Sequence, residues 1–574
     1  MTRRRMNKSR SYETIRKNEI DWYVLTTYAR SIPGELVEKV RMVASCPECR
    51  IIRENNVRIS MLVPQPERGE VIFAKRYKCR GLKDIVKHFF VPSKALSEWR
   101  IMNAFLDRGI PVARPLAYGE KRKGGCLFDS YLFTEALDHA VPLRDFYEQS
   151  LVPQSSSEHE LKKRMLLHQL ATLVSSIHAQ GFFYRDLHAG NVLVLQRDDK
   201  PLELYPVDFH KAWHLKRIPD FMRIRDLAQL KNSLSVSPAD QWRFLKAYTH
   251  DAPMNCTDLK KYARRIAKKA EQLWRVHLKS RTKRCLVKST EFEVAKDLTR
   301  SLYYSKAYSG NMLDDVISNY GNPSASERIT VLKETPKEVV SFTTVNWGGE
   351  KRKVLVKEAR FLRLITRLRY CFFRTRAMRS WIAARGLKVR GVTTPEAIAC
   401  IEKRSFGLPS QTMLLMDFVD HVYELNDYVL KRFGKTLSPQ EVHMKNRFIK
   451  KCALRLRAIH EKGIYHADLK SNNILVKELP ADTWEFYFID LDSVFFRRTL
   501  SFKERSNNLA QINASIADCI TLSDRLYFFK TYARGTLLLK ESKRYFQRIM
   551  HIGSTKNTQP YGVTVPPPCK QNAG

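Results

Sequence analysis

Gly181-Phe-Phe-Tyr-Arg-Asp-Leu-His-Ala-Gly-Asn-Val-Leu-Val194 is an apolar segment, a polar loop and a second apolar segment. The loop holds Asp186 and Asn191, and the flanking apolar runs are typical of short buried strands. Val207-Asp208-Phe209 follows and places a second carboxylate at the end of another apolar strand. We therefore expect these three polar side chains to lie on loops that face one site.

The same arrangement occurs a second time in the chain. Residues 463–476 are Gly-Ile-Tyr-His-Ala-Asp-Leu-Lys-Ser-Asn-Asn-Ile-Leu-Val, and Asp468, Asn473 and Asp490 each lie 282 positions after their counterparts. The same offset relates further pairs outside the loop, namely Lys75 and Lys357, Trp99 and Trp381, and His178 and His460. A constant offset over so many positions predicts two copies of one large domain.

The residue types in the loop suit phosphoryl transfer. This chemistry needs a carboxylate that receives the proton of the acceptor hydroxyl and oxygen ligands that hold Mg²⁺ on the triphosphate of ATP. The predicted catalytic residues are Asp186 and Asp468. The predicted metal ligands are Asn191 and Asp208 in the first copy and Asn473 and Asp490 in the second.

A lysine within a predicted strand precedes each loop. Lys75 lies in Glu70-Val-Ile-Phe-Ala-Lys, after a hairpin turn predicted at residues 66–69. Such a lysine either binds the α- and β-phosphates or lies at the surface of an edge strand, and the downstream loop favours phosphate binding. Glu98, the only acid between residues 94 and 106, is the expected ion-pair partner of Lys75. No glycine-rich motif precedes Lys75, so we expect a turn with few glycines to cover the phosphates.

The second copy departs from the first at the position of this glutamate. Ser380 replaces Glu98, and residues 359–395 contain no Asp or Glu. Lys357, the predicted phosphate-binding lysine, therefore lacks its usual partner, and the adjacent Glu358 is the alternative. The same arginine-rich segment has two interpretations: an interfacial helix beside anionic headgroups, or a core helix with a cationic outer face.

The composition restricts the class of partner. Lys and Arg total 101 against 59 acidic residues, a formal charge of +42, which suits nucleic acid, an anionic membrane or a phosphorylated substrate. No zinc-finger, homeodomain or RNP motif is present, so we expect no specific nucleic-acid binding. The absence of a secretory segment and of a membrane-spanning run, with 11 scattered cysteines, predicts a cytoplasmic protein with reduced thiols.

The expected organisation is an N-terminal domain at residues 1–300, a C-terminal domain at 301–553 and a disordered tail at 554–574. The chain resembles the bacterial lipopolysaccharide kinase (Kdo/WaaP) family over roughly residues 60–250 and 340–530. The resemblance rests on the two loops, on Phe488-Ile-Asp-Leu-Asp and on the Lys-Ala-Leu-Ser-Glu-Trp-Arg segment after the lysine strand. It implies an α+β fold with two tandem bilobal kinase-like domains.

The resemblance further implies ATP and Mg²⁺ as cofactors and a lipid A–core acceptor, phosphorylated on Kdo or heptose at the cytoplasmic face of the inner membrane. The duplication and Ser380 depart from the family pattern and place full activity of the second copy in question. Two alternatives stay open. One is a Ser/Thr protein kinase, which Lys470 favours and the missing glycine loop disfavours; the other is a scaffold whose C-terminal copy is a pseudokinase.

Overall fold

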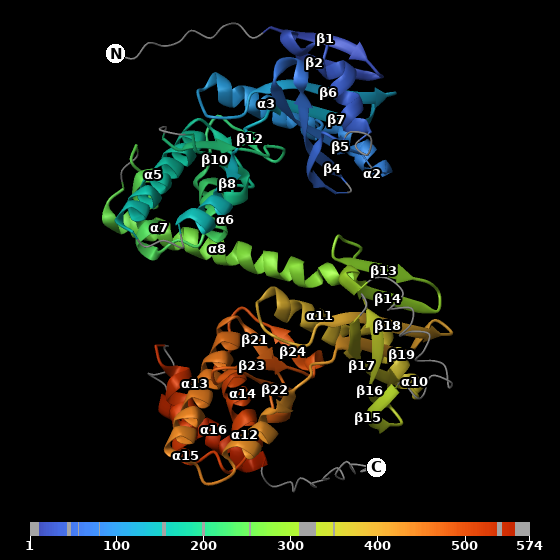
Figure 1. Cartoon of the computed structure of the whole chain (residues 1–574), viewed down its shortest axis with the longest axis vertical. Helices are drawn as coiled ribbons and strands as arrows, with labels where there is room; N and C mark the ends of the chain where they lie inside the picture. Colours follow the sequence, from blue (N-terminus) through green and yellow to red (C-terminus); the bar gives the residue numbers. More distant parts are fainter. Residues whose placement is uncertain are drawn as a thin grey trace. The chain divides into compact units, whose positions relative to one another are not determined.

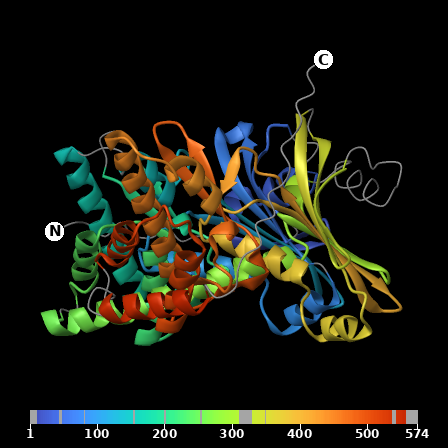
Figure 2. The ribbon, with the colours of Figure 1, turned by 90° about the horizontal axis from the view of Figure 1, so that it is seen from below.

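The computed structural model describes residues 11–42, 47–55, 57–79, 81–151, 156–197, 201–251, 254–308, 329–347, 350–535 and 542–556. The chain divides into two compact units, Met1–Trp274 and Arg275–Gly574. In each unit an N-terminal lobe built on a large sheet precedes a mainly helical lobe (Figure 1, Figure 2). The expected α+β architecture with two tandem kinase-like regions is therefore present.

The N-terminal lobe of the first unit contains a seven-stranded antiparallel sheet in the order β1-β2-β6-β7-β5-β4-β3. Its strands are β1 (Tyr12–Lys17), β2 (Ile20–Leu25), β3 (Arg50–Glu54), β4 (Arg58–Gln65), β5 (Glu70–Lys78), β6 (Pro115–Lys123) and β7 (Cys126–Glu135). The helices of this lobe are α1 (Val37–Arg41), α2 (Leu82–Phe90) and α3 (Lys94–Asp107). Alternating burial along β4 and β5 places one apolar face of the sheet against α3 and the other against α1.

The C-terminal lobe of the first unit surrounds a long buried helix, α5 (Ser157–Ala179), which Ser156 caps by accepting a hydrogen bond from the His159 N–H. The other helices are α4 (Leu143–Phe146), α6 (Asp220–Ser233), α7 (Pro238–Tyr248) and α8 (Cys256–Lys283). The short strands are β8 (Val141–Pro142), β9 (Phe182–Phe183), β10 (Val192–Leu195), β11 (Glu203–Pro206) and β12 (Trp213–His214). The strand pairs β10–β11 and β9–β12 hold the loop at 184–191 between them.

The second unit repeats this order. Its large sheet runs β13-β14-β18-β19-β17-β16-β15, which is the strand order of the first sheet. The strands of the unit are β13 (Phe292–Lys296), β14 (Arg300–Ser305), β15 (Ile329–Thr335), β16 (Glu338–Trp347), β17 (Glu350–Arg360), β18 (Ala397–Ser405), β19 (Leu408–Asp417), β20 (Val422–Glu424), β21 (Ile464–His466), β22 (Ile474–Leu479), β23 (Thr483–Phe488) and β24 (Val494–Phe496). Its helices are α10 (Leu364–Phe372), α11 (Arg376–Val389), α12 (Leu425–Phe433), α13 (Pro439–Glu461), α14 (Phe502–Ser515), α15 (Leu522–Ala533) and α16 (Ser542–Lys556).

The boundaries of the two units differ from the expected ones. The division falls within α8, before the expected junction at residue 300, and β13 at 292–296 pairs with β14 in the second sheet. Of the expected tail at 554–574, residues 554–556 end helix α16, and 557–574 lie outside the described residues. Among the described cysteines, eight are free and Cys49 is disulfide-bonded, so the expectation of uniformly reduced thiols is wrong for Cys49.

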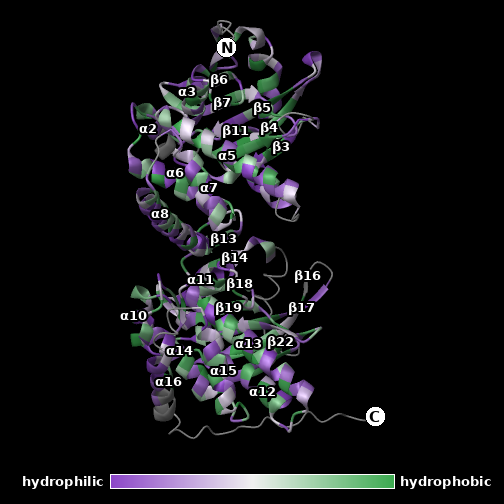
Figure 3. Cartoon of the chain, turned by 90° about the vertical axis from the view of Figure 1, so that its left-hand side faces the viewer, coloured by the Kyte–Doolittle hydropathy of each residue, from purple (hydrophilic) through white to green (hydrophobic). Residues whose placement is uncertain are grey.

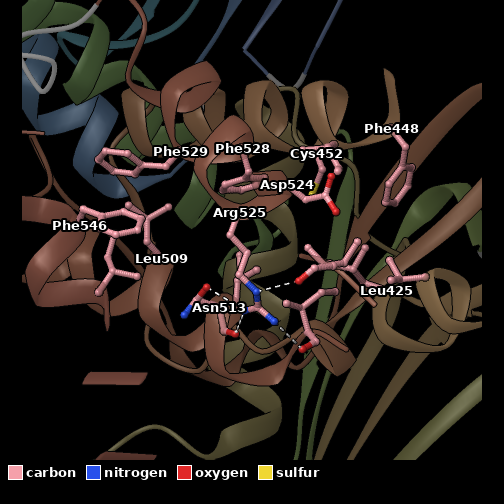
Figure 4. Close-up of a pocket in the computed structure, with 16 residues that line it drawn as sticks. Leu425, Phe448, Cys452, Leu509, Asn513, Asp524, Arg525, Phe528, Phe529 and Phe546 are labelled. Atoms are coloured by element: carbon pink, nitrogen blue, oxygen red, sulfur yellow. Dashed lines mark hydrogen bonds between the residues drawn. The ribbon is translucent and has the colours of Figure 1, made fainter. Parts of the chain in front are cut away.

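Each helical lobe encloses an apolar cavity at the corresponding place. The cavity of the first unit, about 350 Å³, is lined by residues of α5, α6, α7 and α8. The cavity of the second unit, about 80 Å³, is lined by residues of α12 to α16 (Figure 4). There the Arg525 side chain donates a hydrogen bond to Asn513 Oδ1 over 2.8 Å.

Candidate active site

The loop at 184–191 is fixed by a buried carboxylate of α6. Asp226 accepts hydrogen bonds from the backbone N–H groups of Tyr184 (2.8 Å) and Arg185 (2.9 Å), and its side chain is fully buried. These bonds support Arg185 in a left-handed conformation with φ of 67°. The sequence interpretation missed Asp226. One feature of the sequence could have indicated it: Asp226 is the only acid between Ile224 and Ala228, next to the apolar pair Leu227-Ala228.

Within the loop, Asp186 and Asn191 are held together. Asn191 Nδ2 donates a hydrogen bond to the Asp186 carbonyl oxygen over 3.0 Å. The Val207 N–H donates to the Asn191 carbonyl oxygen over 2.9 Å, which brings Asp208 beside Asn191. Lys211 Nζ lies 2.6 Å from Asp186 Oδ2, a contact that the sequence did not predict. The structure therefore groups all three predicted loop residues and adds a lysine to them.

The predicted ion pair between Lys75 and Glu98 is present. Lys75 Nζ lies 2.8 Å from Glu98 Oε2, and the Tyr77 hydroxyl donates to Glu98 Oε1 over 2.7 Å. Alternation along β5 places Lys75 and Tyr77 on the same face of the strand, toward α3. Glu98 is fully buried, so its charge depends on these two partners. Burial, together with the negative charges of Glu98 and Asp208, raises the pKa of Tyr77 well above its ordinary value.

Three basic residues surround Asp208. Arg58 Nη1 (2.9 Å), His210 Nδ1 (2.7 Å) and Lys75 Nζ (3.9 Å) all approach its Oδ1 atom. Burial alone would raise the pKa of Asp208. The hydrogen bond from His210 and the charges of Lys75 and Arg58 outweigh burial and hold this pKa well below its ordinary value. Asp208 is therefore a carboxylate at every physiological pH.

The hairpin turn predicted at residues 66–69 is present and joins β4 to β5. It lies at one end of β5, where Ile72 pairs with Glu135 of β7. Arg58, whose guanidinium lies beside Asp208, begins β4 at the other end, and Asn55 Oδ1 accepts the Arg58 N–H over 2.8 Å. Strand β3, which pairs with β4, shows no clear period in the sequence and was not predicted.

The donor atoms of this site fit Mg²⁺. Asp208 supplies a carboxylate, and Asn191 supplies an amide oxygen because its amide nitrogen is engaged by Asp186. Hard oxygen ligands of this kind are those that Mg²⁺ prefers. Among the described residues, Glu98, Asp208 and His210 also lie close enough to share a cation. The engagement of Glu98 by Lys75 and Tyr77 argues against that grouping.

The second copy folds its loop in the same way. Asn473 Nδ2 donates to the Asp468 carbonyl oxygen over 2.7 Å, and the Ile489 N–H donates to the Asn473 carbonyl oxygen over 3.0 Å. Asp490 follows Ile489, as Asp208 follows Val207. Lys470 Nζ lies 3.1 Å from Asp468 Oδ1. A lysine therefore pairs with the loop aspartate in both copies, although it comes from different chain positions.

The lysine of the second copy lacks its glutamate. Lys357 Nζ lies 3.8 Å from Asp490 Oδ1, and the Asp490 side chain is 52% exposed, against 16% for Asp208. Glu358 is buried and accepts hydrogen bonds from Arg360 Nε and Gln411 Nε2. Adjacent strand residues point to opposite faces, so Glu358 cannot reach Lys357. The alternative that Glu358 replaces the missing partner is wrong.

Helix α11, which contains Ser380, is instead anchored through arginine. Arg379 Nη2 lies 3.2 Å and Arg376 Nε 3.5 Å from Asp492 Oδ2. Asp492 stands 282 positions after His210, so an acid replaces a basic residue there. The arginine-rich segment forms two helices: α11 is largely buried, whereas α10 has no buried residue. The interpretation as a core helix therefore fits α11, whereas α10 is an exposed helix.

The side chain that supports the second loop carries no charge. Asn508 stands at the position of Asp226, donates to the His466 carbonyl oxygen over 2.5 Å and contacts His460 Nε2 at 3.1 Å. His460 is fully buried, and this burial, with the nearby Arg505 charge, lowers its pKa to about 3. Without a carboxylate beside it, His460 stays uncharged.

Comparison with known proteins supports the interpretation of both copies. The model of the lipopolysaccharide kinase (Kdo/WaaP) family matches residues 47–248 and 326–532. The lipopolysaccharide core heptose(I) kinase WaaP of Escherichia coli is 27% identical over 191 residues, 31% of this chain and 71% of that protein. The 3-deoxy-D-manno-octulosonic acid kinase of Pasteurella multocida is 24% identical over 122 residues, 21% of this chain and 46% of that protein.

Among solved structures, one titled "WaaP in complex with acyl carrier protein" matches with a TM-score of 0.32 and 24% identity. The match covers 39% of this chain and 88% of that chain. The family model accounts for most of the chain, once in each copy, and both matches contain the loop that holds the aspartate and the asparagine. The chain belongs to the lipopolysaccharide kinase (Kdo/WaaP) family.

Proposed function

We propose that the first copy transfers the γ-phosphate of ATP to a hydroxyl of a lipopolysaccharide inner-core sugar, Kdo or heptose. The observation that carries the proposal is the buried Lys75–Glu98 pair beside Asp208, in a chain whose relatives are named as kinases of these two sugars. The pair matters because phosphoryl transfer depends on positioned charges more than on covalent chemistry.

Each residue of the first site has a role in this proposal. Asp186 orients the acceptor hydroxyl and accepts its proton late in the reaction, while Lys211 Nζ, 2.6 Å from Asp186 Oδ2, holds this carboxylate in position. Lys75, braced by Glu98, binds the α- and β-phosphates.

Asn191 Oδ1 and Asp208 Oδ2 would hold Mg²⁺, because Arg58, Lys75 and His210 all approach the other oxygen of Asp208, Oδ1. Bound Mg²⁺ would supply charge neutralisation on the β- and γ-phosphates. Arg58 Nη1 lies 2.9 Å from Asp208 Oδ1, so we assign Arg58 to the phosphate side of the site.

The second copy would contribute less to transfer. Asp468, Asn473, Asp490 and Lys357 repeat the residues of the first site. Lys357 lacks a glutamate, however, and the half-exposed Asp490 has weaker charge support than Asp208. We therefore assign the main activity to the first copy and a weak or scaffolding role to the second.

The experiment compares Asp186→Ala and Asp468→Ala in the full chain, with labelled ATP, Mg²⁺ and purified core oligosaccharide. We expect the first variant to lose transfer and the second to keep most of it. Loss of transfer in Asp468→Ala alone would reverse the ranking of the copies. Labelling of a protein substrate but of no oligosaccharide would favour the protein-kinase alternative, and mass spectrometry of the core from a deletion strain would identify the sugar.

The proposal also includes peripheral binding at the anionic cytoplasmic face of the inner membrane. Helix α10 exposes Ile365 (80%) and Phe372 (86%) beside several arginines, and Figure 3 shows apolar and polar residues together on it. Helix α2 exposes Phe90, 282 positions before Phe372, to the same extent. Such helices suit a bilayer interface. Among the described residues, no helix combines the length and the apolar character needed to cross a membrane.

A further inference from the structure

A cationic cavity of about 610 Å³ lies beside the catalytic loop of the first copy. It is lined by residues of the loop, of β9 and β12, and of helices α6 and α8. Five cationic side chains line it, and no carboxylate does: Arg185, Arg225, Arg265, Lys268 and Lys269. Arg265 pairs with Asp220 Oδ2 at 2.6 Å, outside the lining, which leaves an excess of positive charge on the wall. Cations of one sign around a concavity create a potential that attracts anions.

Two of the arginines are held in position by aromatic rings. The Arg185 guanidinium lies 5.0 Å from the centre of the Trp213 ring, and that of Arg225 lies 5.9 Å from the centre of the Phe183 ring. Such stacking orders a guanidinium and leaves its N–H groups available to an anion. Arg225 Nε is a buried donor without a hydrogen-bond partner among the described residues. A buried donor of this kind is costly unless a ligand satisfies it.

The cavity also has an apolar wall. Trp213 is 46% exposed and Phe221 is 64% exposed, and both line it. Exposed aromatic rings beside charged groups suit a sugar, because the C–H face of a pyranose ring is apolar whereas its substituents are polar. Acidic groups on such a ring would meet the arginines and lysines. Phosphate and carboxylate both match the planar guanidinium group.

The second copy lacks several of these features. The residues 282 positions after Arg185, Arg225 and Trp213 are Ala467, Asn507 and Phe495. The copy with the incomplete Lys–Glu pair has thus also lost two of the cations. The complete Lys–Glu pair and the full set of cations thus occur in the same copy, which links the cavity to the activity assigned to that copy.

We infer that this cavity binds an acidic sugar of the acceptor, carrying a phosphate or a carboxylate, while the sugar to be phosphorylated lies at Asp186. Arg185 and Asp186 are consecutive, so their Cα atoms are about 3.8 Å apart, and the inference assigns the two residues to different sugars of one oligosaccharide. The inference rests on the proposed sugar-kinase function and adds to it the acidic group that selects the acceptor.

The test uses the full chain and the variants Lys268→Ala/Lys269→Ala and Arg225→Gln. The matched control is Lys450→Ala/Lys451→Ala, an adjacent exposed lysine pair on α13. The probes are a deacylated core oligosaccharide that carries its acidic groups and the same oligosaccharide after phosphatase treatment and carboxyl reduction. We expect the cavity variants to raise the KM for the acidic acceptor about tenfold or more, with an unchanged KM for ATP. The control should behave as the unmodified chain does.

An equal rise in KM for the acidic and the neutral oligosaccharide, or no rise, would overturn the inference. Calorimetric binding of the acidic oligosaccharide separates it from the proposed function. If the unmodified chain binds the oligosaccharide without phosphorylating it, and the cavity variants lose binding, the cavity assignment stands and the proposed activity fails. Loss of binding to phosphatidylglycerol vesicles with retained oligosaccharide binding would assign the cations to lipid instead. Equal competition by inorganic phosphate alone would show that no sugar is recognised.

Discussion

Arg379 and Asp492 form an ion pair across 3.2 Å, which joins α11 to the segment after Asp490. In the first copy the same place holds His210, which approaches Glu98 of α3 at 3.8 Å. The helix and the loop therefore contact each other in both copies. The acidic residue of the contact is Glu98, on the helix, in the first copy and Asp492, in the loop, in the second. This exchange explains why Lys357 has no acidic partner on α11.

The exchange predicts a gain of function. In an Asp186→Ala background, the double substitution Ser380→Glu/Asp492→His would restore the first-copy arrangement beside Lys357. We expect residual transfer by the second copy to rise about tenfold, because a braced lysine positions the phosphates better. Rates with labelled ATP would measure it. Asp492→His alone removes the ion pairs of Arg379 and Arg376 without adding a glutamate, and an equal gain from it would contradict this explanation.

Loss of the lysine should affect the two copies differently. Lys75→Met leaves the fully buried Glu98 with the Tyr77 hydroxyl and, at 3.8 Å, His210, so we expect a loss of about 3 kcal/mol in the free energy of unfolding of the first unit. Lys357→Met is the control, because Lys357 is more exposed and its ion pair with Asp490 is long, at 3.8 Å. Urea unfolding followed by hydrogen exchange in α3 and α11 would show the contrast. Similar losses in both variants would mean that the buried Lys75–Glu98 pair contributes no more to the free energy of unfolding than the exposed Lys357–Asp490 pair.

Asp226 should be essential for the shape of the first loop. In Asp226→Asn, one oxygen that accepts a backbone N–H becomes an NH₂ group, and a buried donor loses its acceptor. We expect about 1–3 kcal/mol of destabilisation and a fall in kcat larger than the change in the KM for ATP. Asn508→Asp makes the opposite change in the second copy, where it places a carboxylate at the position that corresponds to Asp226. A normal kcat in Asp226→Asn would show that the loop keeps its shape without these bonds.

Acid should destabilise the second copy through His460. Its pKa, about 3, lies below the value of about 6.5 expected in the unfolded chain, so between these values the unfolded chain holds more protons. The stability that depends on neutral His460 is complete above about pH 6.5 and decreases as the pH falls, by up to about 1.4 kcal/mol per unit. Hydrogen exchange of α13 at pH 5 and pH 7.5 would measure this. His460→Gln should remove the dependence; an unchanged slope would assign it to another group.

Membrane binding should depend on α10. Ile365→Ser/Phe372→Ser removes two exposed apolar side chains, and we expect about tenfold weaker binding to vesicles that contain phosphatidylglycerol. Leu298→Ser, at another exposed apolar position, is the control and should bind normally. Sedimentation with vesicles measures the binding. Equal binding to vesicles of phosphatidylcholine alone would contradict a role for the arginines.

Much of the architecture could be predicted because the chain carries it twice. A constant offset of 282 positions relates the loops, the lysine strands and the buried tryptophans, which indicates that both copies have one fold. The two large sheets do share one strand order. The missing glutamate at Ser380 was equally visible, because one position of a repeat can be compared directly with the other.

The tertiary structure decided which charges meet. Arg58 is 150 positions from Asp208, and Lys211 is 25 positions from Asp186, so neither contact has a local signal. Strand β3 was missed because it has no periodic pattern, and Glu358 was misjudged because strand alternation turns it away from Lys357. Sequence determines residue types and their spacing along one chain. The pairing of charges that are distant in the sequence depends on how strands and helices pack. Packing brings the two groups together and removes the water that would weaken their attraction.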